Sequence, residues 1–275
     1  MSTLYVMKPP ELITSAANPL LKDLRRAIAR GEPTADGLWV AEGFHLLDEA
    51  LRSDCAVPCV LAAASVRVTV RRYAEDLAGT RTIVLPDNLF GSVATTETSQ
   101  GLIALVQPPS WRIEQVFRRQ SMVVVLDGLQ DPGNAGAVVR AAEAFGATGV
   151  LFLKGSASPS NPKTLRASAG SLFRIPFIAG MDVSTAVAAL RAERVDVFAA
   201  MPYSGSERLA EEIDFSRRCA LVIGNEGRGV SEELRAISED IAIPTVGVES
   251  LNAAVAAAIL LYETRRQRVR EAARV

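Results

Sequence analysis

Histidine and cysteine are scarce in this sequence of 275 residues, and their scarcity argues against several classes of protein. The single histidine, His45, excludes histidine-rich metal sites and disfavours a Ser-His-Asp mechanism. The three cysteines, Cys55, Cys59 and Cys219, lack the paired short spacing of a zinc ribbon, and their odd number argues against a disulfide framework. Free thiols in a reducing cytoplasm are the expected state, and no metal is implied.

Neither an excess of one charge nor a long apolar run is present. The chain has 30 basic and 31 acidic residues, which disfavours a strongly basic nucleic-acid coat protein but allows a local basic patch. The longest apolar stretches, 55–66 and 253–262, are shorter than the roughly 20 residues that a membrane-spanning helix needs. Residues 1–10 lack the basic and apolar regions of a secretory signal. We therefore expect a soluble, cytoplasmic protein without a membrane segment.

The composition is that of a globular protein with a sizeable core, at 49% hydrophobic and 22% charged residues. Pro108 and Pro109 end an apolar run and predict a domain boundary, with a smaller domain at 1–107 and a larger one at 108–275. Strand-like and helix-like segments alternate in both halves, which predicts an α/β fold with a mainly parallel sheet.

The hydrophobic periodicity predicts the individual elements. The expected helices cover residues 18–30, 44–52, 66–77, 134–145, 183–193, 231–237 and 250–268. The expected strands cover residues 38–41, 58–62, 82–85, 102–106, 122–126, 149–153, 195–199, 220–223 and 241–243.

The first segment with chemical interest is a glycine-bearing turn between the strand at 122–126 and the next helix. Asn134 is the predicted N-cap of that helix, and Arg140 follows near its second turn; helix N-termini favour anions. The spacing Gly133-x-x-Gly136 fits neither the dinucleotide fingerprint nor a P-loop, so NAD and ATP are disfavoured. A well-capped helix with a surface arginine explains these residues equally well.

The second segment reads G-N-E-G-R-G from Gly224 to Gly229 and follows the strand at 220–223. Three glycines in six residues permit close approach of a ligand to the backbone, together with positive φ angles. Glu226 lies between glycines, where it is poorly placed to serve a core. A tight strand–helix turn is the simpler alternative, although it needs fewer glycines.

The third segment runs from Ile243-Pro244 to Ser250-Leu251-Asn252 and precedes an alanine-rich helix. Ser250 is the predicted N-cap, and Asn252 is expected in the first turn. Polar residues there compete with the helix for hydrogen bonds and therefore prefer caps and sites. A capped, buried helix is again the alternative.

Taken together and in this order, the three segments resemble the SpoU (TrmH-like) family of RNA ribose 2′-O-methyltransferases, within the SPOUT superfamily. The resemblance covers about residues 120–268 and rests on Asn134-x5-Arg140, on Gly224-Asn225-Glu226-Gly227-Arg228-Gly229, and on Ile243-Pro244 with Ser250-Leu251-Asn252. The chain departs from the family at Thr245, where methionine is frequent, and at Asn225, a position that varies. More loosely, Ile13-Thr14-Ser15-x-x-Asn18-Pro19 and Val40-Ala41-Glu42-Gly43 resemble the family's N-terminal substrate-binding domain, which is similar to ribosomal RNA-binding proteins.

The resemblance implies a fold, a cofactor and a partner. The C-terminal segment would be threaded into a deep trefoil knot, and the chain would form a homodimer with the site near its interface. S-adenosylmethionine would contact Gly224, Ile243 and Leu251, largely through backbone groups. The polar site would comprise Asn134, Arg140, Glu226, Ser250 and Asn252.

The implied reaction is methylation of a ribose 2′-hydroxyl in RNA. Arginine stays protonated in proteins, so Arg140 suits a phosphate clamp and alkoxide stabiliser better than a base. Asn134 would orient Arg140 or the ribose, and Glu226 would order Arg140 or the loop. Ribosomal RNA is favoured over transfer RNA by the two-domain layout, and a role in antibiotic resistance stays open. Arg25, Arg26 and Arg30 are candidate RNA contacts or simply a solvated helix face.

Two other functions compete with this hypothesis. A non-catalytic RNA-binding protein of the same fold would have no need of both Arg140 and the pair Ser250 and Asn252. A doubly wound enzyme for a small metabolite would neither bind nor modify RNA.

Overall fold

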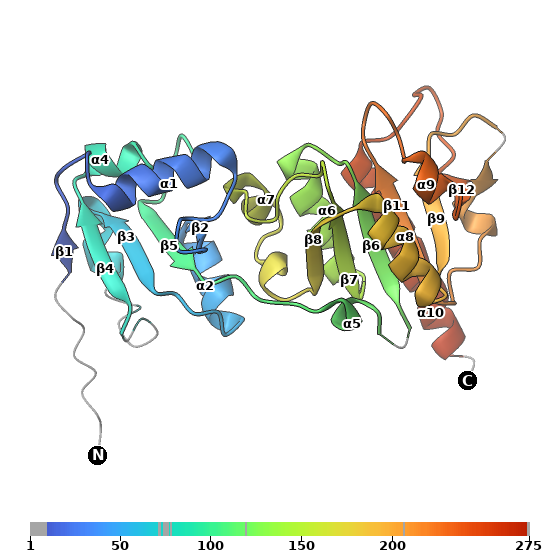
Figure 1. Cartoon of the computed structure of the whole chain (residues 1–275), viewed down its shortest axis with the longest axis horizontal. Coiled ribbons are helices and arrows are strands. Elements are labelled where there is room, and N and C mark those ends of the chain that lie inside the picture. Colours follow the sequence, from blue (N-terminus) through green and yellow to red (C-terminus); the bar gives the residue numbers. More distant parts are fainter. Residues whose placement is uncertain are drawn as a thin grey trace, which may run out of the picture. The chain divides into compact units, whose positions relative to one another are not determined.

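The computed structural model describes residues 10–70, 73, 77, 79–118, 120–205 and 207–273. It divides into two compact units: Met1–Pro109 with Ser160–Arg174, and Ser110–Pro159 with Ile175–Val275 (Figure 1). The expected domains, 1–107 and 108–275, meet at a single boundary. The first compact unit instead also includes residues 160–174 from the second half of the chain. Within the described part of the chain, no helix is both long and apolar enough to cross a membrane.

The second unit is built on a seven-stranded sheet in which every neighbouring pair is parallel. The order is β10-β12-β9-β11-β6-β7-β8. The strands are β6 (Met122–Asp127), β7 (Gly149–Leu153), β8 (Phe177–Met181), β9 (Asp196–Met201), β10 (Arg208–Leu209), β11 (Cys219–Gly224) and β12 (Glu239–Ala242). The predicted mainly parallel sheet is confirmed for this unit; β8 and β10 were not predicted.

Helices cover this sheet in two layers. Alternate residues of a strand point to opposite faces, and Val123 and Val125 of β6 join one apolar cluster with Leu190 and Leu234. Those last two residues belong to α8 (Val183–Ala192) and α9 (Glu232–Arg235). The short α5 (Ile113–Val116) contributes to the same cluster. The helices α6 (Pro132–Ala144) and α10 (Ala253–Ala272) pack against each other, and α10 also contacts β11.

The chain changes direction across the sheet next to β6. From β6 it adds β7 and β8 on one side, then crosses to β9 and later fills the space between β6 and β9 with β11. In open α/β sheets, ligands bind beyond the carboxyl ends of strands at such a switch point. The residues following β6, β9, β11 and β12 are therefore the first place to look for a site.

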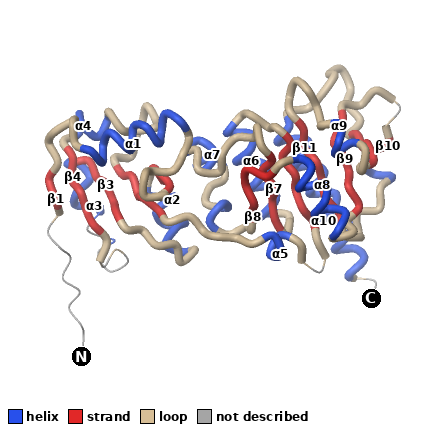
Figure 2. Tube along the Cα trace, viewed as in Figure 1, coloured by secondary structure: helices blue, strands red, loops and turns tan. Residues whose placement is uncertain are grey.

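The first unit contains a five-stranded sheet of order β1-β4-β3-β5-β2. Figure 1 labels these strands, and Figure 2 shows the strands in red. The strands are β1 (Glu11–Leu12), β2 (Trp39–Glu42), β3 (Cys59–Ala63), β4 (Arg81–Leu85) and β5 (Leu102–Val106). This smaller α/β unit has a mixed sheet, because β5 runs antiparallel to both of its neighbours, whereas β4 runs parallel to β1 and β3. The helices are α1 (Pro19–Arg30), α2 (Phe44–Arg52), α3 (Arg67–Val70) and α4 (Asp87–Gly91). The expected helix at 66–77 is described only as far as Val70; most of its remainder lies outside the described residues.

Residues 160–174, which include α7 (Pro162–Ala167), belong to this first unit through charged contacts. Glu42, whose side chain is 3% exposed, accepts hydrogen bonds from Thr95 and Thr96 and lies 3.9 Å from Arg166. Arg174 pairs with Glu49 at 2.5 Å. A buried carboxylate is costly unless it is paired or hydrogen-bonded, so Glu42 has a structural role here.

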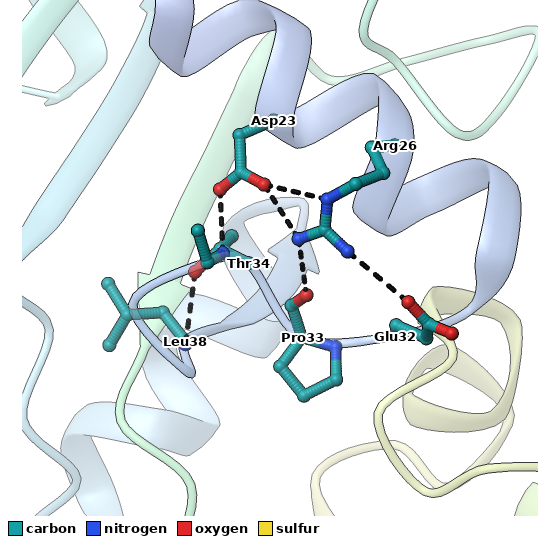
Figure 3. A network of polar contacts seen from close by, with 7 residues as sticks. Asp23, Arg26, Glu32, Pro33, Thr34 and Leu38 are labelled. Carbon is teal, nitrogen blue, oxygen red and sulfur yellow. Dashed lines mark hydrogen bonds and ion pairs between the residues drawn. The ribbon is translucent and has the colours of Figure 1, made fainter.

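Arg26 on α1 is part of a polar network within this unit (Figure 3). Its guanidinium donates to Asp23, Glu32 and the carbonyl of Pro33. Arg25 is similarly engaged, by Ser92 and the carbonyl of Ala16. These two arginines therefore stabilise the fold of α1 and its neighbours. Arg30 is exposed and has no polar contact with the residues that the structure describes.

Two predicted helix starts are wrong by a few residues. Asp131, not Asn134, caps α6: its carboxylate accepts the N–H of Asn134 at 2.7 Å, and Pro132 occupies the first helical position. Asn252, not Ser250, caps α10, accepting from the backbone of Ala254 and Val255. The side chains of Asn134 and Ser250 therefore do not cap a helix and can serve a site. Asn252 lies at the entrance of α10.

Candidate active site

A cavity of about 430 Å³ lies beyond the carboxyl ends of β9, β11 and β12. Its walls come from the second unit. They combine apolar side chains with the exposed backbone of a glycine-rich loop. The lining includes Tyr203, Gly224, Asn225, Glu226, Ile243, Leu251 and Asn252.

Gly224 ends β11 at a point where no side chain fits. A Cβ at this position would lie 2.5 Å from the carbonyl carbon of Gly229 and 2.7 Å from the nitrogen of Val230. The loop returns on itself because Asn225 and Gly229 exchange two backbone hydrogen bonds, at 3.0 and 2.9 Å. Gly229 has φ +70°, which glycine adopts without strain. The glycines thus create a bare backbone wall.

The opposite wall is formed by the chain that follows β12. Ile243 and Leu251 are half-buried and line the cavity, as do the exposed residues Ser250 and Asn252. Thr245, the departure from the family pattern, also lines it, and its hydroxyl donates to the carbonyl of Val248 at 2.9 Å. The second and third segments of the sequence therefore meet at one cavity, and the first joins them through Asn134.

Three predicted site residues form a continuous hydrogen-bonded row. The Nδ2 of Asn252 donates to Oδ1 of Asn134 at 3.0 Å, and the Nδ2 of Asn134 donates to Oε1 of Glu226 at 3.1 Å. Asn134 comes from α6, Glu226 from the glycine-rich loop and Asn252 from the start of α10. The row presents amide and carboxylate groups at the edge of the cavity, where they can orient a hydroxyl group.

Arg140 does not join this row. It is exposed, does not line the cavity, and makes no hydrogen bond or ion pair with the described residues. Six residues along α6 correspond to roughly two thirds of a turn beyond a whole one, so the helix carries Arg140 and Asn134 on different sides. Asn134 and Glu226 contact each other instead of ordering Arg140.

Two residues that line the cavity, Tyr203 and Asn225, were not predicted as site residues from the sequence. Tyr203 follows β9 and lines the cavity, while 40% of its surface stays exposed. The signal that could have found it is topological, because β9 ends beside β11 and β12. Asn225 makes three side-chain hydrogen bonds inside the loop and to the end of β6.

Two family models match different parts of the chain. The model of the SpoU rRNA Methylase family matches residues 121–262, more than half of the chain. The model of the MRM3-like substrate binding domain matches residues 18–104. The chain belongs to the SpoU rRNA methylase family.

Individual relatives extend the similarity over nearly the whole chain. The 23S rRNA (guanosine(2553)-2′-O)-methyltransferase RlmP of Bacillus subtilis (strain 168) is 36% identical over 256 residues, which is 92% of this chain and 98% of the relative. A 23S rRNA (uridine(2479)-2′-O)-methyltransferase of Streptomyces viridochromogenes is 33% identical, covering 67% of this chain and 66% of the relative. An AdoMet-bound rRNA methyltransferase from Sinorhizobium meliloti superimposes with a TM-score of 0.78 at 25% identity, covering 93% and 97% of the two chains.

Proposed function

We propose that this chain is an S-adenosylmethionine-dependent methyltransferase that methylates a ribose 2′-hydroxyl in ribosomal RNA. The observation that carries the proposal is the row Asn252–Asn134–Glu226 beside the bare backbone at Gly224. It brings the polar groups of all three family segments to one cavity. The rRNA-modifying relatives support the same reaction class.

The cavity fits the cofactor by size and by chemistry. A volume of about 430 Å³ lies within the range of ligand pockets, and such pockets combine apolar walls with a few polar groups. Ile243 and Leu251 supply apolar surface for an adenine, and Gly224 supplies backbone that no Cβ covers. When bound, S-adenosylmethionine supplies a methyl group on a sulfonium, ready for a nucleophile.

The polar residues act on the ribose. A 2′-hydroxyl is a weak nucleophile until its proton leaves, so the site must orient it and stabilise the developing alkoxide. Asn134 and Asn252 hold each other in place, and with Ser250 they orient the ribose. Glu226 fixes Asn134 from the other side.

Arg140, which lies outside the cavity lining, serves as a clamp on an RNA phosphate next to the target nucleotide. Its planar guanidinium stays protonated and binds phosphate through two parallel hydrogen bonds. Its exposure on α6 leaves it accessible to RNA. Arg140→Lys tests this role, because lysine keeps the charge but loses the fork; activity near that of the wild type contradicts it.

The first unit presents the RNA. The match to a substrate-binding domain at 18–104 supports this division of labour, with domains at 1–107 and 108–275. Arg30 is the exposed arginine of α1 that other side chains leave accessible for a phosphate. A ribosomal RNA substrate also places the enzyme in the cytoplasm. The deep trefoil knot stays a prediction from the family.

The active form is a homodimer that uses one face of α10. Val255, Ile259 and Tyr262 follow helical spacing and expose 48%, 40% and 56% of their surface. An exposed apolar stripe of this kind marks an interaction surface. Ile259→Asp should therefore lower the mass measured by light scattering to that of a monomer, whereas Val68→Asp, at an exposed valine of the first unit, should not.

The deciding experiment is transfer of labelled methyl from S-adenosylmethionine to size-separated RNA from a strain that lacks this gene. Label in ribosomal RNA, at one ribose that becomes resistant to alkaline cleavage, is the expected result. The Arg140→Ala protein run in parallel should lose most of the label. Label confined to transfer RNA would make the chain a transfer RNA methyltransferase. RNA binding without cofactor binding would identify a non-catalytic RNA-binding protein.

A further inference from the structure

The side chain of Asn225 connects the glycine-rich loop to the neighbouring strand. Its Oδ1 accepts the backbone N–H groups of Gly227 and Arg228, both at 2.9 Å, and its Nδ2 donates to the carbonyl of Gly128 at 2.8 Å. The two backbone donors fix the amide orientation, because a rotated amide would point its own donor at them. Asn225 therefore uses both ends of its amide.

A second contact fastens the far end of the same loop. Asp127, the last residue of β6, is 7% exposed, and its Oδ2 accepts the backbone N–H of Ser231 at 2.7 Å. Asp127 is also paired in register with Gly224 across the sheet. The loop 225–231 is thus attached at both ends to the pair Asp127 and Gly128.

That pair is itself held rigidly. Gly128 donates its N–H to the hydroxyl of Ser156 at 3.0 Å, and this hydroxyl donates to the carbonyl of Leu126 at 2.8 Å. The chain then continues from Gly128 into α6, which carries Asn134. The strand end that anchors the glycine-rich loop also leads directly to Asn134, the residue that contacts Glu226 of that loop.

We propose that Asn225, together with Asp127, is a positioning residue that holds the glycine-rich loop in the form that binds the cofactor and aligns Glu226 with Asn134. The inference rests on the proposed methyltransferase function and adds residues to its machinery. Asn225 acts through the loop backbone. Removal of its donor should therefore weaken cofactor binding and, through Glu226, the alignment of the polar row.

Asn225→Asp tests the donor itself. The carboxylate keeps an acceptor for Gly227 and Arg228 but turns an oxygen toward the carbonyl of Gly128. Loss of this bond should weaken S-adenosylmethionine binding, measured by calorimetry at about pH 8, about tenfold, as expected for the roughly 1.5 kcal/mol of one hydrogen bond. A protonated carboxyl can donate to Gly128, and desolvation beside that carbonyl raises the pKa of such a carboxyl. Binding relative to the wild type should therefore recover at about pH 5.

Two further variants separate the donor from other effects. Asn225→Ala should bind weakly at both pH values, since it has no carboxyl to protonate. Asn88→Asp, the same change at an exposed position outside the cavity lining, should bind as the wild type does. The charged side chains beside the loop, Asp127, Glu226 and Arg228, are unchanged in all variants. The ratio to wild type at each pH therefore isolates the introduced carboxyl.

The outcomes distinguish a failure of the Asn225 role from a failure of the proposed function. Wild-type affinity of Asn225→Asp at about pH 8, or weak binding that fails to recover at about pH 5, overturns the role of the Asn225 donor. A wild-type protein that binds no cofactor overturns the proposed function instead. Amide exchange in the cofactor-free protein then still decides the positioning role: the peptide covering 225–231 should exchange faster in Asn225→Ala, and unchanged exchange would refute it.

Discussion

The side-chain amide of Asn252 donates to the amide oxygen of Asn134 at 3.0 Å, although the two residues lie 118 positions apart in the sequence. Asn134 in turn donates to Glu226. An asparagine is well suited to this middle position because it offers an acceptor on one side and a donor on the other. The relationship ties the entrance of α10 to α6 and to the glycine-rich loop, and it makes a specific mutational prediction.

Asn134→Asp should reduce the methyl-transfer kcat more than Asn134→Ala does. The aspartate carboxylate still accepts from Asn252, but it would face the carboxylate of Glu226 in place of a donor. Loss of one positioned polar group at a reaction centre costs about 10²–10³ in kcat, and like-charge repulsion adds to that loss. Cofactor affinity should change much less, because Gly224, Ile243 and Leu251 are untouched.

The double variant Asn134→Asp with Glu226→Gln provides the control. A glutamine at 226 can donate to the aspartate, so it should recover part of the lost kcat, and Glu226→Gln alone sets the reference for the cycle. Strictly additive losses would show that the contact between these two residues does not contribute to catalysis.

Local sequence signals placed two candidate site residues at the wrong helix positions. Asn134 and Asn252 stood out as polar residues at helix entrances, yet Asp131 caps α6 and Asn252 itself caps α10. The rules for N-caps depend on residue type alone, and each helix start offers two suitable residues within four positions: Asp131 and Asn134 for α6, and Ser250 and Asn252 for α10. Only the backbone conformation decides between them, through Pro132 in the first case.

Long-range relationships were beyond these local signals. The contact of Asn134 with Asn252 depends on β11 entering the sheet between β6 and β9, and no spacing in the sequence encodes that insertion. Residues 160–174 belong to the first unit, where Arg166 pairs with Glu42 and Arg174 pairs with Glu49. Hydrophobic periodicity predicts that a segment forms a helix or a strand but not which element it packs against. The family resemblance of the three ordered segments, by contrast, implies that they lie close together in space.

Gly224→Ala should abolish cofactor binding and lower the stability of the second unit. The new Cβ would lie 2.5 Å from the carbonyl carbon of Gly229 and 2.6 Å from its oxygen, and a backbone contact cannot give way as a flexible side chain can. Overpacking of this kind costs about 1–3 kcal/mol. Calorimetry with S-adenosylmethionine and a thermal melt measure the two effects.

Gly91→Ala is the matched control for that substitution. Gly91 ends α4 in the first unit and has no positive φ, and a Cβ added there would meet no atom of the described residues within 4 Å. This variant should keep wild-type cofactor affinity and stability. Normal binding by Gly224→Ala would show that the loop can open without cost and that its bare backbone is not required.

The thiols of Cys59 and Cys219 should resist alkylation in the folded protein. Burial raises the pKa of each to about 11, with nearby Arg81 and Arg268 opposing the shift. Because folding favours the neutral thiol, this contribution to stability is complete below the ordinary thiol pKa near 9 and is lost as the pH rises toward 11. Iodoacetamide at about pH 8, followed by peptide mass spectrometry, should modify both cysteines only after unfolding in guanidinium chloride. Rapid labelling of the native protein would contradict this burial.

Arg268→Ala should destabilise the second unit and weaken cofactor binding from a distance. The guanidinium of Arg268, near the end of α10, donates to five acceptors: the carbonyls of Gln120, Ser121, Phe215 and Arg217 and the sulfur of Cys219. Arginine can bind so many acceptors because its five N–H donors form a rigid planar fork. A single hydrogen bond to a charged group contributes about 1.5–3 kcal/mol to the free energy of unfolding. These contacts fix the end of α10 opposite to Asn252.

The effect on binding follows from that geometry, since Asn252, Ala256 and Leu260 of the same helix segment line the cavity. Release of the far end should lower the melting temperature and raise the cofactor Kd together, and Arg268→Lys should restore neither fully because lysine lacks the fork. Arg265→Ala, three residues earlier and exposed, should leave both unchanged. A variant that melts early yet binds cofactor normally would show that α10 is held in place at the cavity by Asn252 alone.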